Sequence, residues 1–581
     1  MWHKTFLFPR RNSNQSNYLV FALICAVAVI FHYPYINTFP AFTHAWAQTD
    51  RYSLAVGFVR NGFDFFHPET FLINHQFPFL FVSPGKQSIT AVDFPIHDYF
   101  VGLIMHILGP EYGANFGGAM PWVFRTYTLG FSVVGLYYFY KLSLLVTKSK
   151  FKSVLALIFC MSSPVFVFYQ SSFLPTIPSL SLTTIALYHY LKYRGFSSVN
   201  ISNLESKKEE IKPSTLTQET QKNNLKHFIY AISLLTFATL SRTTFAIPLI
   251  AIISIELLRF LRFEKIKGNR LTIATKILVV LISGTFIGGF AYHNSLLSTQ
   301  YGSIFLSSFL PAESWIEVKQ IVSKSYHTWI KQYFSKSHYH IATVIISLTI
   351  FAKFYLKKQV AIHQKQFLFI VLIITLGCII FSSLMLKQFV DHDYYFLDSF
   401  YFPICLLLVF ILSFSPSVSD FLNTTTLKHT IIHGVILVAV AVPLMTKAHK
   451  MQKGRRHIHD YDIMYKTVEN FKESGKLLTQ LQVPDTAKIL IISVFSPNTP
   501  FVFLNRKGYA INSPHQAHID LALSWDYDYI IIENDVFAAE IHTVYPGLAS
   551  QLKKVGDNGK ITVYTYDRDI IPLPLNGPVP Q

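Results

Sequence analysis

Charged residues are scarce in this sequence, and their scarcity excludes a soluble globular protein. Asp, Glu, Lys and Arg together make up 14% of the 581 residues, whereas soluble domains contain roughly a quarter. Hydrophobic residues make up 51% and aromatic residues 16%. This balance is typical of an α-helical protein that crosses a membrane many times.

Cysteine and recognisable metal motifs are also lacking. The four cysteines lie inside apolar stretches, where cysteine behaves as a small buried hydrophobic residue, so neither a disulfide framework nor a cysteine metal site is predicted. They are Cys25, Cys160, Cys378 and Cys405. None of the 23 histidines has a ligand spacing such as HExxH, so no structural metal is predicted. One alternative stays open, a divalent cation held between Asp50 and Asp93.

Negative charge is in short supply as well. The chain has 32 acidic and 50 basic residues, a net charge of +18. From Arg455 to the end there are 12 basic and 14 acidic residues, a net charge of −2, so the preceding part carries +20. Basic loops of a membrane protein set its topology and contact anionic lipids, and nothing in this distribution suggests nucleic acid as a partner.

Long apolar runs predict about eleven transmembrane helices, each near the roughly 20 residues that a bilayer requires. The first follows a basic N-terminus and has no small-residue cleavage site, so we expect an uncleaved helix with a cytoplasmic N-terminus. Most basic loops fall on that same side, as in a multi-pass protein of the plasma (inner) membrane. A further segment, 313–334, is predicted to be an interfacial helix. The predicted spans are 18–36, 126–147, 152–170, 173–193, 226–242, 245–262, 272–292, 338–356, 366–386, 396–414 and 428–446.

The first 454 residues are predicted to form one membrane domain. Its first outer loop, 37–121, contains helix-like segments at 51–60 and 95–109 that are too short or too polar to span, so we expect them to lie along the outer interface. A polar insert at 194–226 has few apolar residues and is predicted to be a cytoplasmic loop without a chemical role.

The C-terminal domain, residues 455–581, is predicted to be extracytoplasmic and to form a small α/β layer, because strand-like runs alternate with helical patterns. Helical patterns lie at 464–481 and 538–554. No glycine-rich phosphate loop is present, so a scaffolding or acceptor-docking role is favoured over nucleotide binding. The predicted strands are 488–494, 529–535 and 561–567.

Three polar clusters fall on the outer face in this topology. They are Asp50 with Arg51, DFPIHD at 93–98 and DHDYY at 391–395. Together they would line a partly desolvated cleft open to lipid on one side and to water on the other, the geometry that a lipid-linked substrate requires. On the same side, Lys86, Arg125 and Arg242 are candidates for binding a lipid phosphate, since arginine can make a bidentate contact.

Each of these residues also has a purely structural interpretation. Asp50 precedes a helix-like run and could be its N-cap, and Asp93 could do no more than start the next helix. The tyrosines of 391–395 are equally typical of an aromatic belt at the membrane surface. Arg125 and Arg242 could extend from helix ends toward the headgroups.

Several segments form a pattern when their order, spacing and predicted side are taken together. They are WAQTDRYSLAVGF followed by FDFFHP, DFPIHDYFVGLIMHILG, FRTYTLGFSVVGLYYFYKL, SPVFVFYQSSFLPTIPSLSL and HDYYFL. The pattern resembles the GT-C superfamily of polytopic glycosyltransferases that use polyprenyl-phosphate sugars, in particular its protein mannosyltransferase and aminoarabinose transferase branch. The resemblance covers most of residues 18–260, the HDYYFL segment and the soluble C-terminal part.

The resemblance implies an inverting glycosyltransferase that moves a hexose or pentose from a polyprenyl-phosphate donor to a lipid, glycan or protein acceptor. In that family an acidic residue soon after the first span serves as general base or orients the acceptor, and Asp50 occupies the matching position. The family often has an adjacent Asp-Glu pair, whereas this chain has Gln48, Thr49 and a lone Asp50. Thr176 replaces another family acid, which leaves Asp93 as the candidate second carboxylate.

One base suffices for this reaction. A polyprenyl phosphate leaves as a stable anion whose second pKa is roughly 6, so no general acid is needed. Deprotonating the acceptor hydroxyl typically contributes about 10²- to 10⁴-fold, and the charge that develops on the phosphate must be neutralised. We predict Asp50 and Asp93 as catalytic residues. The predicted substrate-binding residues are Arg51, Lys86, His97, Arg125, Arg242, His392, Asp393, Tyr394 and Tyr395.

Two alternative functions stay open. An oligosaccharyltransferase or polysaccharide ligase would differ in using a donor with two phosphates. A non-enzymatic polytopic transporter would place ionisable residues near the middle of the membrane and would have two related halves, whereas the acids here gather at one predicted face.

Overall fold

The computed structural model forms two compact units. The first, called here the bundle unit, comprises Met1–Tyr35, Thr128–Ile287 and Phe309–Gly454. The second, the sheet unit, comprises Ile36–Tyr127, Gly288–Ser308 and Arg455–Gln581. The residues described are 13–40, 43–74, 87–109, 120–196, 213–261, 270–305, 308–355, 357, 359–416, 426–457, 462–512 and 515–566.

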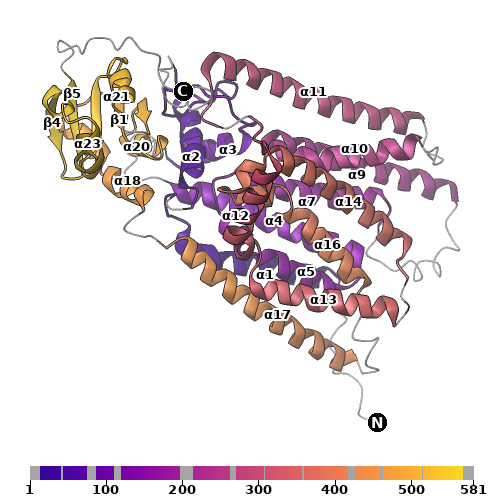
Figure 1. Cartoon of the computed structure of the whole chain (residues 1–581). Coiled ribbons are helices and arrows are strands. Elements are labelled where there is room, and N and C mark those ends of the chain that lie inside the picture. Colours follow the sequence, from indigo (N-terminus) through magenta and orange to yellow (C-terminus); the bar gives the residue numbers. More distant parts are fainter. Residues whose placement is uncertain are drawn as a thin grey trace. The chain divides into compact units, whose positions relative to one another are not determined.

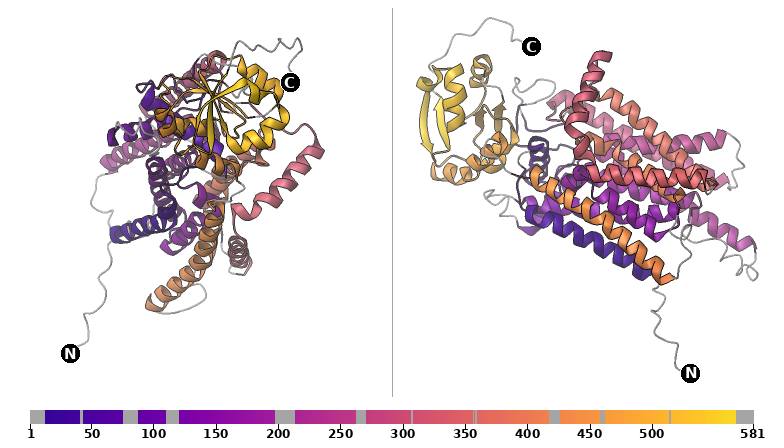
Figure 2. Two further views of the ribbon diagram at one scale, coloured as in Figure 1. Left: turned by 90° about the vertical axis from the view of Figure 1, so that its left-hand side faces the viewer. Right: turned by 60° about the horizontal axis from the view of Figure 1, so that its bottom comes forward.

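Helices make up the bundle unit, and Figures 1 and 2 show its long helices lying alongside one another. α7 packs along α9, and α14 packs against α10 and α16. Three helices, α4, α11 and α17, contain residues of both units. The helices are α1 (Ser13–His32), η1 (Tyr33–Tyr35), α4 (Pro121–Thr147), α5 (Lys150–Met161), α6 (Pro164–Tyr169), α7 (Thr176–Tyr193), α9 (Pro213–Ser241), η5 (Thr243–Phe245), α10 (Ala246–Leu261), α11 (Arg270–Tyr301), α12 (Trp315–Tyr333), α13 (Lys336–Phe354), α14 (Ile362–Leu384), η6 (Leu386–Phe389), α15 (Tyr394–Asp398), α16 (Tyr401–Phe414) and α17 (Thr426–Arg455).

Within the described residues, six helices are long and apolar enough to cross a membrane. Each of the other predicted ranges also contains helix, but that helix is shorter, interrupted or less apolar. The count of eleven spans therefore stays a prediction. The six are Gln15–Tyr35, Pro121–Thr147, Thr243–Leu261, Leu271–Tyr301, Ile362–Leu384 and Lys428–Arg455.

The single helix predicted at 152–170 is wrong, because the helix is interrupted between α5, which ends at Met161, and α6, which begins at Pro164. Pro164 is the first residue of α6 and Ser163 before it is non-helical, with φ −59° and ψ 124°. Proline disfavours helical backbone at the residue that precedes it and is well suited to the first turn of a new helix.

The cysteines behave as expected of small hydrophobic residues, since three of the four free cysteines are buried.

The short helices predicted outside the spans are confirmed as helices. α2 (Ala45–Arg60) begins six residues before its predicted start at 51, and α3 (Ile96–Leu108) matches 95–109 closely. α12 covers most of 313–334 and begins where the Ser314 side chain accepts a hydrogen bond from the backbone N–H of Glu317, a typical N-cap. Their location at a membrane surface stays a prediction.

The sheet unit contains a five-stranded sheet of order β2-β1-β3-β5-β4, drawn in yellow in Figure 2. β1 pairs in parallel with β2 and β3, while β5 pairs antiparallel with β3 and β4. Short helices connect the strands, as expected of an α/β layer. The elements are α18 (Ile463–Phe471), α19 (Ser474–Gln480), β1 (Ile489–Ile492), α20 (Asn498–Leu504), β2 (Gly508–Ile511), α21 (Gln516–Leu523), β3 (Tyr529–Glu533), α22 (Asn534–Val536), η8 (Phe537–Ile541), α23 (His542–Val544), α24 (Leu548–Gln551), β4 (Leu552–Asp557) and β5 (Ile561–Tyr566).

The three predicted strands are confirmed as β1, β3 and β5, whereas β2 and β4 were not predicted. The continuous helix predicted at 538–554 is wrong: three short helical pieces are followed by β4. Pro546 and Gly547 interrupt the helical pattern, because proline disfavours helical backbone at Tyr545 and glycine propagates a helix poorly.

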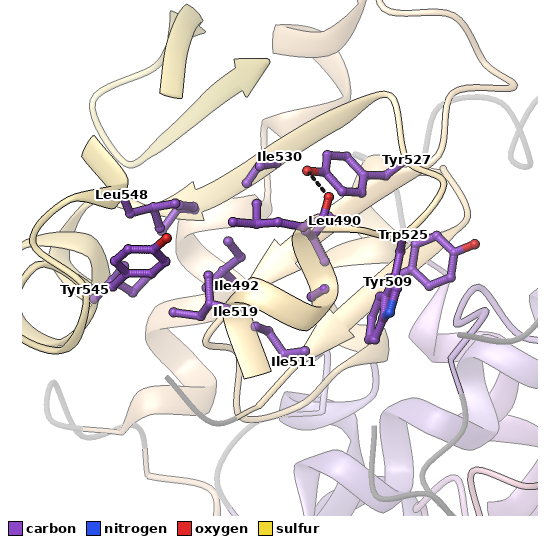
Figure 3. Close-up of a cluster of buried hydrophobic side chains, with 14 of the residues drawn as sticks. Leu490, Ile492, Tyr509, Ile511, Ile519, Trp525, Tyr527, Ile530, Tyr545 and Leu548 are labelled. Carbon is purple, nitrogen blue, oxygen red and sulfur yellow. Dashed lines mark hydrogen bonds between the residues drawn. The ribbon is translucent and has the colours of Figure 1, made fainter. Parts of the chain in front are cut away.

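One hydrophobic cluster of the sheet unit contains every second side chain of β1. Figure 3 shows Leu490 and Ile492 of β1 packed among side chains of β2, β3 and α21. The Tyr527 hydroxyl donates to the backbone oxygen of Leu523 at 3.1 Å, which satisfies the polar end of a buried ring. Ile73 of the first outer loop belongs to the same cluster.

The segment 71–74 also extends the sheet. Leu72 pairs in parallel with Gly508 at the edge of β2, and the backbone N–H of Ile73 donates to the Gly508 oxygen at 2.7 Å. The Asn74 side chain bonds both backbone groups of Ala510, at 2.7 and 2.9 Å. A Cβ at Gly508 would lie 1.8 Å from the oxygen of Ile489, so only glycine fits where these segments meet.

Candidate active site

Asp50 lies inside α2, and this position excludes its interpretation as an N-cap. The helix begins at Ala45 after His44, whose side chain makes no capping hydrogen bond. Asp50 is therefore on the second turn, with only 3% of its surface exposed. Most of α2 from Gln48 to Phe58 is buried in the same way, so this carboxylate is removed from water by the packing of the whole helix.

A buried amide holds the Asp50 carboxylate. Asn498, the first residue of α20, donates from Nδ2 to Asp50 Oδ1 at 2.8 Å. Ser53, one turn along α2, donates from Oγ to Asn498 Oδ1 at 3.1 Å. Because Ser53 occupies the amide oxygen, the amide nitrogen faces Asp50. Ser53 and Asn498 are fully buried, and both partners are neutral.

Burial raises the pKa of Asp50 to about 7. Hydrogen bonds from Asn498 and Trp46 and the positive charge of Arg51 oppose this shift but do not cancel it, because desolvation of a charged carboxylate is the larger effect. Near neutral pH the group therefore populates both protonation states, which is the property required of a general base that works at that pH.

Arg51 faces α3 and pairs with Asp98. Its Nη2 lies 3.6 Å from Asp98 Oδ2, with both side chains almost fully buried, and its guanidinium lies 5.3 Å from the ring centroid of Phe305. Neither oxygen of Asp98 accepts a hydrogen bond from the described residues. Burial raises the pKa of Asp98 to about 6, opposed by Arg51.

The remaining predicted residues of DFPIHD lie beside this pair. His97 Nδ1 lies 2.9 Å from the Tyr127 hydroxyl, and burial together with Arg51 lowers the pKa of His97 to about 3, so the imidazole is neutral at pH 7. Asp93 is partly buried, and its charge contributes to the raised pKa of Asp98. The N-cap position of α3 is Pro95, two residues after Asp93.

Arg125 and Lys86 are the other two basic residues predicted for this region. Arg125, in the first turns of α4, is buried, and its Nε donates to the backbone oxygen of Thr38 at 2.9 Å. It therefore holds the segment that follows the first helix instead of extending to the surface. Lys86 lies outside the described residues.

In the bundle unit, Arg242 makes a two-point contact with Asp398. Its Nε and Nη2 donate to Asp398 Oδ2 at 2.9 and 2.7 Å. The guanidinium also lies 5.6 Å from the ring centroids of both Tyr394 and Tyr395, within the range of a cation–π interaction. Both tyrosines are 8% exposed, which argues against an aromatic belt in contact with headgroups.

Asp393 and His392 complete this second group. Asp393 Oδ1 accepts a hydrogen bond from the Tyr169 hydroxyl at 2.6 Å, and the carboxylate is fully buried. The ring of His392 lies 5.4 Å from that of Tyr394. The structure thus brings the predicted residues of 391–395 together with Arg242, and it adds Tyr169 and Asp398.

The predicted site residues therefore form two groups, and a single cleft that contains both stays a prediction. Sequence reasoning missed Ser53, Asn498 and Asp98 in the first group, and Tyr169 and Asp398 in the second. Only Asp98 had a local signal, since it ends DFPIHD. No group of three or more His, Cys, Asp or Glu side chains within the described ranges could hold a metal ion. The groups are Asp50, Arg51, Asp93, His97 and Arg125 in the sheet unit, and Arg242, His392, Asp393, Tyr394 and Tyr395 in the bundle unit.

Comparisons with known proteins identify a related fold. No protein-family model and no curated protein sequence matches the chain. The apo oligosaccharyltransferase of Archaeoglobus fulgidus is similar over 97% of this chain and 76% of that chain, with a TM-score of 0.53 and 12% identity. ArnT from Cupriavidus metallidurans in the apo state is similar over 95% and 98% of the two chains, with a TM-score of 0.45 and 8% identity. The first likeness shows that the chain shares the fold of that oligosaccharyltransferase, and this agrees with the expected architecture of many helices and a small C-terminal sheet domain.

Proposed function

We propose that this protein is an inverting membrane glycosyltransferase that moves a sugar from a polyprenyl-phosphate donor to a lipid, glycan or protein acceptor. The observation that carries the proposal is Asp50, a buried carboxylate that is held by a neutral amide and has a pKa of about 7. The fold supports it, since the chain is similar to an oligosaccharyltransferase.

In this mechanism Asp50 takes the proton of the acceptor hydroxyl. A general base is most effective when its pKa lies near the working pH, and such a step contributes about 10²- to 10⁴-fold. The hydroxyl oxygen attacks the anomeric carbon while the bond to the phosphate oxygen breaks, so the configuration inverts. The lipid phosphate leaves as a stable anion and needs no proton donor.

Asn498 is proposed as the residue that positions this base. Its amide fixes one carboxylate oxygen of Asp50 and is itself oriented by Ser53. A hydrogen bond to the charged form also limits how far burial raises the pKa. The C-terminal domain therefore takes part in the reaction, as the source of Asn498.

The donor phosphate is proposed to meet paired arginines. Arg51 is compensated by Asp98 and Arg242 by Asp398, so each arginine would contribute directed N–H groups more than net charge. Arg125 and Lys86 stay in the proposal as further phosphate ligands. His97, His392, Asp393, Tyr394 and Tyr395 are proposed to contact the sugar, and Asp93 is proposed as the second catalytic carboxylate.

A second candidate function is an oligosaccharyltransferase or polysaccharide ligase that uses a donor with two phosphates. The likeness to the archaeal oligosaccharyltransferase favours keeping it. The base chemistry of Asp50 would be the same in both cases, and only the donor would differ. For either reaction we propose an outer-face site in the plasma membrane, with the N-terminus in the cytoplasm.

The test is sugar transfer by the full chain reconstituted in lipid nanodiscs. Polyprenyl-monophosphate hexoses and pentoses form one arm, and polyprenyl-diphosphate oligosaccharides form the other. We expect transfer with wild type and with Asp557→Asn, a matched change at the exposed last residue of β4, and a loss with Asp50→Asn. NMR of the product should show an inverted anomeric centre. Undiminished transfer by a folded Asp50→Asn protein would remove Asp50 from the mechanism.

A further inference from the structure

A group of basic and aromatic side chains surrounds one carboxylate at one end of the bundle unit. It consists of residues where α7 and α10 end and α11 begins, and it is separate from every residue of the proposed active site. We call it the Glu256 cluster. Its members are Tyr190, Tyr193, Arg194, Glu256, Arg259 and Lys276.

Glu256 is the fixed point of the cluster. The Tyr190 hydroxyl donates to its Oε1 at 3.0 Å, and the Tyr193 hydroxyl donates to its Oε2 at 2.8 Å. Both oxygens of the carboxylate are therefore held by hydroxyl groups from α7 before any cation is considered. This arrangement orients the carboxylate toward the basic side chains.

Three cations share this single carboxylate. Arg259 donates to Oε1 at 3.1 Å, a nitrogen of Arg194 lies 3.7 Å from Oε1, and Lys276 Nζ lies 3.9 Å from Oε2. These four ionised groups carry a net charge of +2. The cation side chains are between 11% and 35% exposed, so an anion from outside can reach them.

Aromatic rings hold the cations in place. Lys276 Nζ lies 4.7 Å from the ring centroid of Tyr193 and 5.6 Å from that of Phe228. The Arg194 guanidinium lies 5.8 Å from the centroid of Tyr190, and one of its nitrogens donates to that hydroxyl at 3.1 Å. A ligand would therefore meet basic groups that are already positioned, at little cost in side-chain entropy.

Exposed apolar side chains flank the cluster on the same two helices. They project from α10 and from the beginning of α11, both of which belong to candidate membrane spans. With a rise of 1.5 Å per residue, Glu256 and Lys276 lie roughly 8–9 Å inside the ends of their helices, a depth near the boundary of headgroups and acyl chains. The exposed residues are Leu257, Leu258, Leu261, Leu271, Ile277 and Leu278.

We propose that the Glu256 cluster binds the phosphate headgroup of an anionic membrane phospholipid. The three cations of the cluster outnumber its one carboxylate and attract the negative charge of a phosphodiester headgroup, and guanidinium groups suit phosphate oxygens. The adjacent apolar surface accommodates the acyl chains, which distinguishes a lipid from a free phosphate ion. Basic pockets between transmembrane helices are known to take anionic lipid headgroups.

The test is native mass spectrometry of the detergent-purified full chain with added lipid. Phosphatidylglycerol is compared with phosphatidylcholine of the same acyl chains, and wild type should bind the former more tightly. Each cation near a headgroup contributes about fivefold, so Lys276→Gln should weaken phosphatidylglycerol binding by about that factor. Glu256→Gln keeps an oxygen for the tyrosine hydroxyls and removes the negative charge, so it should strengthen binding by a similar factor.

Two control variants distinguish a headgroup contact at this cluster from a general effect of charge or of stability. Lys387→Gln removes a cation that pairs with Glu313 and Glu317 elsewhere in the unit and should bind phosphatidylglycerol like wild type. Lys276→Arg keeps the charge and should also bind like wild type, even if Lys276→Gln lowers the melting temperature.

Three results would overturn the proposal. The first is equal affinity for the two lipids, and the second is a lack of response to both Lys276→Gln and Glu256→Gln. The third is displacement of phosphatidylglycerol by millimolar inorganic phosphate, which would assign the cluster to a free anion instead of a lipid.

Discussion

Asp50 of the sheet unit and Asp398 of the bundle unit are the same kind of side chain at almost the same exposure, 3% and 4%, yet their partners differ. The neutral amide of Asn498 donates one hydrogen bond to Asp50, whereas the Arg242 guanidinium donates two to Asp398. A buried carboxylate beside a neutral donor keeps its affinity for a proton. A buried carboxylate that faces a guanidinium instead serves as the counter-ion that fixes an arginine. The group that contacts the carboxylate, and not burial alone, therefore distinguishes Asp50, the proposed base, from Asp398, which positions Arg242.

Removal of the Asp50 charge is expected to have the largest effect on activity. Asp50→Asn should reduce transfer by about 10²- to 10⁴-fold without lowering the melting temperature, because the change removes a poorly compensated buried charge. Activity assays and thermal unfolding in detergent, on the same preparations, check both parts. If Asp50→Asn loses activity only because it unfolds, Asp50 has a structural role, like Asp398, and is not the base.

The pH dependence of stability should separate Asp50 from its neutral replacement. Because folding raises the pKa of Asp50 to about 7, its stabilising contribution is complete below about pH 4 and is lost as the pH rises to 7. Asp50→Asn has no such loss. Over that window wild type should fall relative to the variant by up to about 4 kcal/mol, at ~1.4 kcal/mol per pKa unit. Parallel melting curves of the two proteins from pH 4 to 8 would contradict the shift.

Asp398→Asn should give the opposite pattern to Asp50→Asn in stability. Removing one partner of a buried ion pair costs about 3–5 kcal/mol, and the lower end is expected because Arg242 keeps some exposure. Chemical unfolding in mixed micelles measures the loss. The double variant Asp398→Leu with Arg242→Met should recover part of it, since no charge is then left unpaired. A single variant as stable as wild type would show that this ion pair has no structural role.

The Asn498→Leu variant tests how the neutral donor tunes the base. Without the amide the pKa of Asp50 should rise further, so the acid limb of the pH–rate profile should move to higher pH. Loss of a hydrogen bond to a charged group costs about 1.5–3 kcal/mol, so transfer at pH 7 should fall by at least about tenfold and recover at pH 9. Ser53→Ala removes the hydrogen bond that orients the Asn498 amide but keeps the amide itself. It should therefore shift the acid limb of the pH–rate profile less than Asn498→Leu does. A uniform loss at every pH would indicate a structural effect instead.

Local features of the fold were predictable because they depend on neighbouring residues. Apolar runs located a helix in every predicted span, and strand-like runs located β1, β3 and β5. Pro164 and Pro546 are visible in the sequence as helix breakers. The predicted helices nevertheless ran across them, because the surrounding apolar or helical pattern is longer. β2 has only four residues, and its place depends on β1 and on a loop far away in the chain, so no local pattern marked it.

The candidate site was predictable only in part, for the same reason. Asp50, Arg51 and His97 stand in short motifs that carry their own signal. Asn498 is 448 residues from Asp50, in the short segment SPNTP, which carries no catalytic motif. Pairing at that distance is determined by tertiary packing, which a single sequence does not display. Asp398 was missed because it follows DHDYY within an apolar run and has no basic residue near it in the chain.

The strand pairing of Leu72 with Gly508 has a consequence for how this protein is made. Asn74 leaves the ribosome 436 residues before Ala510, the residue to which its side chain bonds. Until residues 508–511 have been synthesised, the segment 71–74 has no sheet to join, and a C-terminal domain produced without that segment would present β2 as a bare edge. Bare edges pair with other chains. The edge of β2 is thus covered by a segment synthesised much earlier, and a C-terminal domain that lacks residues 71–74 is expected to self-associate through β2.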